Sequence, residues 1–102
     1  MKYEIKEYIN YIYIEKKLSD NTKDAYQRDL NNFSSFLKNK NINNITTNDI
    51  RNYINYLSDN NDKDKTIARK VVSIRTFFDY LMKEKKINEN PCEKIELPKI
   101  KK

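Results

Sequence analysis

Residues 66–85 read TIARKVVSIRTFFDYLMKEK, and this stretch decides the fold class. Its apolar residues recur in steps of four and three, at Ile67, Val71, Ile74, Phe78 and Leu81. An α-helix turns once in about 3.6 residues, so this spacing places all five side chains on one helical face. The stretch is therefore predicted to be a helix that buries this face in a core.

Three further helices are expected upstream, at about residues 3–17, 20–38 and 48–59, because their apolar residues have the same spacing. Ser19 precedes the second and Thr46 or Thr47 the third, and serine and threonine are preferred N-caps. Ile42 and Ile45, in the connection between these two helices, are expected to fill the core. The sequence predicts an all-α domain of four helices.

The chain has no glycine, which disfavours tight β-hairpins and excludes glycine-rich phosphate loops. Asparagine is expected to take the left-handed turn positions instead. There is no histidine and the single cysteine is Cys92, so an internal disulfide and a Cys/His metal site are both excluded. We expect no cofactor, no metal and no catalytic residue in this chain. The acidic residues form no metal-type cluster, which disfavours a self-contained nuclease.

No apolar run approaches the roughly 20 residues that span a bilayer, and the N-terminus does not resemble a signal peptide. A cytoplasmic protein without membrane contact is expected.

The net charge is +6, and its distribution is uneven. Residues 1–62 hold nine basic and nine acidic side chains, whereas residues 63–102 hold twelve and six. A basic second part suggests a polyanionic partner, although a lysine-rich surface can also serve solubility alone.

A polar stripe runs along the helix expected at 66–85, away from its apolar face. Arginine, serine and threonine on such a stripe can bind base edges or phosphates in the major groove of DNA, and lysine adds charge. Thr22 and Lys23, in the first turn of the second helix, form a smaller candidate phosphate site. The alternative interpretation is that these residues form an ordinary solvent-exposed helix face with no binding role. The candidate residues of the stripe and its flanks are Lys65, Thr66, Arg69, Lys70, Ser73 and Thr76. Arg75 is instead expected to pair with Asp79, four residues further on.

Two parts of the sequence resemble tyrosine recombinases of the phage-integrase or Xer type. Residues 14–22 and 25–30 read IEKKLSDNT and AYQRDL, which is similar to the family signature EK-LS-NT followed by AY-RDL. The second similar block comprises Ala68, Arg69, Ile74, Arg75, Phe77, Phe78, Tyr80, Leu81, Glu84, Asn90 and Pro91. Ile95, Leu97, Pro98 and Lys99 resemble the entry to the family's interdomain linker.

The resemblance implies a compact, orthogonal four-helix bundle of the SAM-like type over residues 1–88, followed by an interdomain linker at 89–102. In that family this core-binding domain forms one jaw of a clamp on double-stranded DNA, with its second and fourth helices in the major groove. The resemblance also implies a tetrameric parent protein, a monomeric isolated domain, and a separate catalytic domain whose tyrosine forms a 3′-phosphotyrosyl link. A helical adaptor whose basic face binds an acidic protein is the alternative.

Overall fold

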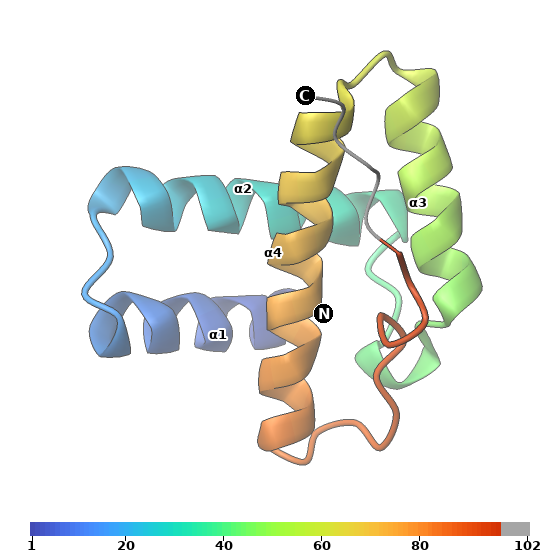
Figure 1. Cartoon of the computed structure of the whole chain (residues 1–102). Coiled ribbons are helices and arrows are strands. Elements are labelled where there is room, and N and C mark those ends of the chain that lie inside the picture. Colours follow the sequence, from blue (N-terminus) through green and yellow to red (C-terminus); the bar gives the residue numbers. More distant parts are fainter. Residues whose placement is uncertain (97–102) are drawn as a thin grey trace. The chain divides into compact units, whose positions relative to one another are not determined.

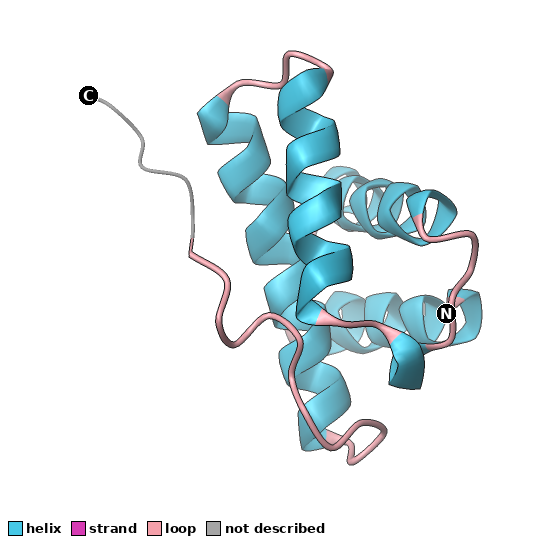
Figure 2. Ribbon diagram, turned by 90° about the vertical axis from the view of Figure 1, so that its right-hand side faces the viewer, coloured by secondary structure: helices cyan, strands magenta, loops and turns pink. Residues whose placement is uncertain are grey.

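The computed structural model describes residues 1–96 and contains four α-helices and one short 3-10 helix (Figure 1). These are α1 (Lys2–Glu15), α2 (Asp20–Phe36), η1 (Ile42–Asn44), α3 (Thr47–Asp59) and α4 (Asp64–Lys83). No strand occurs among the described residues (Figure 2), which confirms the all-α prediction. Each expected helix is present, and α4 begins and ends two residues earlier than the sequence pattern indicated. Residues 97–102 of the expected linker lie outside the described part.

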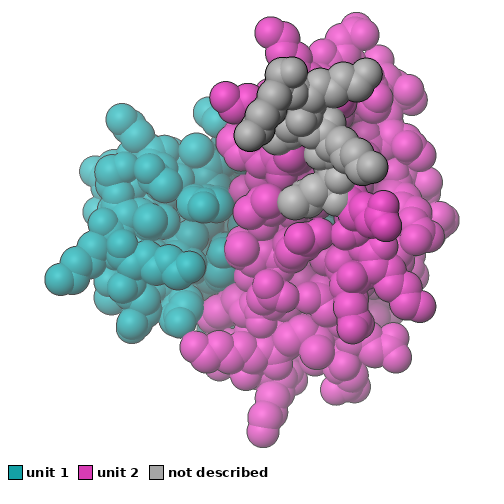
Figure 3. All heavy atoms as spheres, in the orientation of Figure 1, with its two compact units in different colours: residues 1–42 teal, residues 43–102 magenta. Residues whose placement is uncertain are grey.

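The chain divides into two compact units, Met1–Ile42 and Asn43–Lys102 (Figure 3). In the first unit, α1 and α2 pack against each other. Ser19 is the N-cap of α2, as predicted, because its Oγ accepts a hydrogen bond from the Thr22 backbone N–H at 3.2 Å. The apolar residues that these two helices bury are Ile5, Tyr8, Ile9, Ile12, Leu30 and Phe33.

In the second unit, α3 packs against α4. Thr46 is the N-cap of α3: the Asp49 N–H donates to its Oγ1 at 3.1 Å, and its own N–H donates to Asp49 Oδ2 at 2.9 Å. This reciprocal capping box satisfies two backbone donors that the helix start leaves free. The five predicted core residues of α4 are all buried, and so are Ile42 and Ile45 of the connection. In α3, Tyr53 is buried and Ile54 is half-buried.

Three helices end in Schellman motifs although the chain has no glycine. In α4, the N–H groups of Lys85 and Lys86 donate to the carbonyls of Met82 and Leu81, which satisfies two of the last carbonyls of the helix. The ends of α2 and α3 repeat this pattern. Among residues 1–96, those with positive φ are Lys17, Lys38, Asn39, Asn61 and Lys85. Asparagine therefore takes only some of these positions, and lysine takes the others.

The segment after α4 folds back onto the second unit. Ile87, Cys92 and Ile95 are buried, and three side-chain hydrogen bonds attach the segment to the helices. Thr47 Oγ1 donates to the Pro91 carbonyl at 2.9 Å, and Arg75 Nη2 donates to the Ile95 carbonyl at 2.8 Å. The folded part of the chain thus extends past residue 88.

The predicted ion pair between Arg75 and Asp79 is wrong, because the returning segment supplies other partners. Arg75 Nη2 is bonded to the Ile95 carbonyl, and Asp79 Oδ1 accepts a hydrogen bond from Asn90 Nδ2 at 2.9 Å. Both partners lie more than ten residues further along the chain, so helical spacing alone could not indicate them.

Candidate nucleic-acid interface

The solvent-exposed face of α4 does not coincide with the polar stripe predicted from the sequence. Phe77 and Ser73 are 0% and 2% exposed, so the buried face extends onto the predicted polar stripe. Ser73 Oγ donates to the Arg69 carbonyl at 3.2 Å. The prediction that Ser73 lies on an exposed stripe is therefore wrong, because Phe77 draws that side of the helix into the core.

We define the exposed face of α4 by the side chains that lie within about 60° of one another on its outer side. Three of them are cationic and exposed, one is apolar and exposed, and one is a half-buried hydroxyl. Its members are Lys65, Arg69, Val72, Thr76 and Lys83. Val72 and Lys83 were missed from sequence. The signal that could have found them was the paired Phe77 and Phe78, since two adjacent buried aromatics rotate the buried face away from Lys83.

The remaining candidates on α4, Thr66 and Lys70, lie outside this face, toward the buried side of the helix. Lys70 is half-buried and its Nζ lies 2.9 Å from Asp62 Oδ2, in an ion pair and hydrogen bond. Thr66 is half-buried in the first turn. On the face itself, the Thr76 hydroxyl donates to the carbonyls of Val72 and Ser73, each at 3.1 Å. Lys65 and Arg69 are the exposed cations of this face in the first half of α4.

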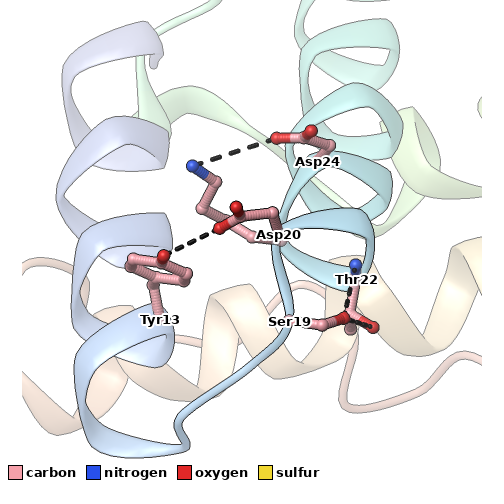
Figure 4. A network of polar contacts seen from close by, with 6 residues as sticks. Tyr13, Ser19, Asp20, Thr22 and Asp24 are labelled. Carbon is pink, nitrogen blue, oxygen red and sulfur yellow. Dashed lines mark hydrogen bonds and ion pairs between the residues drawn. The ribbon is translucent and has the colours of Figure 1, made fainter.

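At the start of α2, polar contacts connect the two helices of the first unit (Figure 4). Tyr13 Oη donates to Asp20 Oδ1 at 2.7 Å, and this bond, with the negative charge of Asp20, raises the pKa of Tyr13. Lys23 Nζ lies 4.8 Å from the centre of the Tyr13 ring and 3.9 Å from Asp24 Oδ1. A cation over an aromatic ring is attracted to it, whereas an exposed ion pair contributes little. Lys23 is therefore held beside α1.

Thr22 lies in the same first turn and is exposed. Its backbone N–H is occupied by the Ser19 cap, and its Oγ1 accepts a hydrogen bond from Ser19 Oγ at 2.9 Å. Because the Thr22 hydroxyl is the acceptor in this bond, its own hydrogen can be donated to an anion. Thr22 and Lys23 are thus both accessible, but the cap has already satisfied one of the backbone donors that a phosphate would use.

The chemistry available elsewhere in the described residues is limited. Residues 1–96 contain no group of three or more histidine, cysteine or carboxylate side chains that could hold a metal ion. Within the same range no helix has the length and apolarity needed to cross a bilayer. Burial raises the pKa of Cys92 to about 12, with a smaller opposing effect of Arg75. The Cys92 thiol is therefore neutral at pH 7, and thiols are nucleophilic mainly as thiolates.

The family model and the relatives that match this chain indicate the same family. Residues 5–85 match the family model described as "Phage integrase, N-terminal SAM-like domain". The chain is 35% identical over 97 residues to the tyrosine recombinase XerD of Rickettsia bellii, covering 93% of this chain and 32% of that protein. It is 39% identical over 98 residues to XerD of Staphylococcus saprophyticus, with 93% and 33% covered. Against the tyrosine recombinase XerC of Leptospira interrogans the identity is 37% over 100 residues, with 95% and 32% covered.

No solved structure matches the chain. The chain spans about one third of the length of the curated relatives it matches. The family model covers most of the chain and all four helices, apart from the first residues of α1. The chain therefore belongs to the family of phage integrase N-terminal SAM-like domains.

Proposed function

We propose that this chain is the DNA-binding N-terminal part of a site-specific tyrosine recombinase, and that it contacts duplex DNA through the exposed face of α4 and the start of α2. The observation that supports this most directly is the pair of accessible cations, Lys65 and Arg69, on the outer side of a helix in a domain of this family. A helix of this kind fits the major groove, where arginine binds guanine edges or phosphates in a bidentate way.

The other members of the exposed face have matching chemistry. Thr76 lies on this face, where a threonine side chain can contact a base edge or a phosphate, and Val72 can contact a thymine methyl group. Thr22 and Lys23 would contact phosphates from the start of α2. Thr66 and Lys70 would contact phosphates from beside this face, and Lys70 must first leave Asp62. Ser73 is not proposed as a contact, because it is buried.

The rest of the reaction is proposed to belong to other parts of the parent protein. The relatives are named tyrosine recombinases, and this chain covers about a third of each. We propose that a separate catalytic domain cleaves and rejoins the strands through a 3′-phosphotyrosyl link, and that the parent acts in the cytoplasm as a tetramer on DNA. On this proposal, the present chain positions the DNA and takes no part in bond breaking.

The proposal is tested by fluorescence anisotropy with a labelled duplex of about 30 base pairs, titrated between about 50 and 200 mM salt. The expected result is binding whose log K falls linearly with log salt, because each neutralised phosphate releases counterions. Arg69→Ala should weaken binding and reduce the magnitude of the salt slope by about 0.9, which corresponds to one phosphate contact. Arg51→Ala is the matched control, since Arg51 is an exposed arginine of α3 outside the proposed face.

Two results would contradict the proposal. If the unaltered chain shows no duplex binding at about 50 mM salt, DNA binding by this domain is wrong, and a helical adaptor for an acidic protein is favoured. If Arg69→Ala is folded and binds as tightly as the unaltered chain, the assigned face of α4 is wrong.

A further inference from the structure

A groove of about 450 Å³ runs between α1 and α2, within the first unit. The two helices lie side by side there, with α1 below α2 in Figure 1. Two buried isoleucines, Ile5 and Ile9, form its apolar floor. All the other residues that line it carry cationic or amide side chains, and they are Lys2, Lys6, Asn10, Lys23, Gln27 and Asn31.

The helical repeat explains why these six side chains gather in one place. In α1, Lys2, Lys6 and Asn10 are spaced four residues apart, so they lie on one face. In α2, Lys23, Gln27 and Asn31 have the same spacing. Each helix therefore contributes one rim of the groove.

All the charged side chains that line the groove are cationic. Residues 1–42 contain six carboxylates, and none of them lines the groove. Asp24 Oδ1 lies 3.9 Å from Lys23 Nζ, on a side chain that is 68% exposed. An exposed pair of this length is weak and leaves the Lys23 charge available. Three cations and three amide groups thus face a channel that no carboxylate neutralises from within.

We propose that this groove binds the phosphate backbone of duplex DNA, so that α1 contributes to DNA contact together with α2. This inference rests on the proposed function and adds a second contact surface to it. Lysine, asparagine and glutamine side chains all donate hydrogen bonds to phosphate oxygens. From Lys2 to Asn10 the rim is about 12 Å long, which corresponds to three or four nucleotides of one strand. No aromatic ring lines the groove, so it offers no platform on which an unpaired base could stack.

The test compares two double variants of the full chain in the duplex titration described above. Lys2→Gln/Lys6→Gln removes two cations from the groove and should reduce the magnitude of the salt slope by about 1.8, since each phosphate contact contributes about 0.9. Lys16→Gln/Lys17→Gln is the matched control, because it removes the same charge from exposed positions just after α1. The control should keep the slope of the unaltered chain.

A second measurement does not depend on charge removal. In ¹H–¹⁵N NMR spectra of the unaltered chain, the side-chain amide signals of Asn10, Gln27 and Asn31 should shift when the duplex is added. Those of Asn52 and Asn55, exposed on α3, serve as internal controls and should shift less.

The proposal that the groove binds DNA is wrong if both double variants weaken binding equally. It is also wrong if the side-chain amide signals of the groove do not shift while the duplex is bound. In that case Arg69→Ala still weakens binding and the proposed function stands. If no duplex binds to the unaltered chain, the proposed function fails and the groove assignment fails with it.

Discussion

Lysine occupies left-handed backbone positions at which most proteins use glycine. Lys17, Lys38 and Lys85 all have φ between 49° and 58°, and each follows the C-cap of a helix. A side chain with a Cβ atom is disfavoured there, because Cβ approaches the following carbonyl oxygen at a cost of roughly 1–2 kcal/mol. The helix ends of this protein therefore contain strain that a single glycine can relieve.

Lys85→Gly is expected to stabilise the protein by about 1 kcal/mol, because glycine adopts the left-handed conformation without steric cost. For a domain of this size, such a gain corresponds to a melting temperature higher by about 4–8 °C. Lys86→Gly is the control: it removes the same charge one residue later, where φ is not positive. Thermal melts by circular dichroism measure both. A lower melting temperature for Lys85→Gly than for Lys86→Gly would show that the backbone at residue 85 is not strained.

At the scale of the element, the sequence predicted the helix α4 correctly but placed its solvent-exposed side wrongly. The apolar stripe of five residues was identified correctly, and all five are buried. Phe77 is buried as well, with its ring centre 5.4 Å from that of Phe78. This widens the buried face and brings Ser73 into it. The exposed face proposed to contact DNA accordingly loses Ser73 and gains Val72 and Lys83.

Phe77→Ala is expected to destabilise the protein by about 3–5 kcal/mol, as truncation of a buried phenylalanine does. Val72→Ala, on the exposed face, should change stability by less than about 0.5 kcal/mol. Urea denaturation measures both differences. If Phe77→Ala unfolds at the same urea concentration as the unaltered protein, the rotated face of α4 is incorrect.

At the scale of the whole molecule, the second unit includes more of the chain than its helices. The returning segment buries Cys92 and Ile95 and gives Arg75 a backbone partner. Arg75 therefore joins α4 to the end of the returning segment, at Ile95.

Ile95→Ala is expected to destabilise the protein by about 2 kcal/mol, because it removes apolar surface from a buried site. Ile14→Ala is the control, since Ile14 is 70% exposed and its truncation should leave stability unchanged within about 0.5 kcal/mol. Both are compared by urea denaturation. Equal midpoints for the two variants would mean that residues 89–95 behave as a linker and do not belong to the folded body.

The sequence by itself determined the four helices, the caps at Ser19 and Thr46 or Thr47, and the apolar stripe of α4. These depend on interactions between residues at most a few positions apart, which the helical repeat makes visible in the sequence. Only the tertiary structure decided the burial of Ser73, the partner of Arg75 and the groove between α1 and α2. Each of these depends on which segment packs against a given helix face, and contacts between residues distant in sequence leave no regular spacing by which they can be recognised.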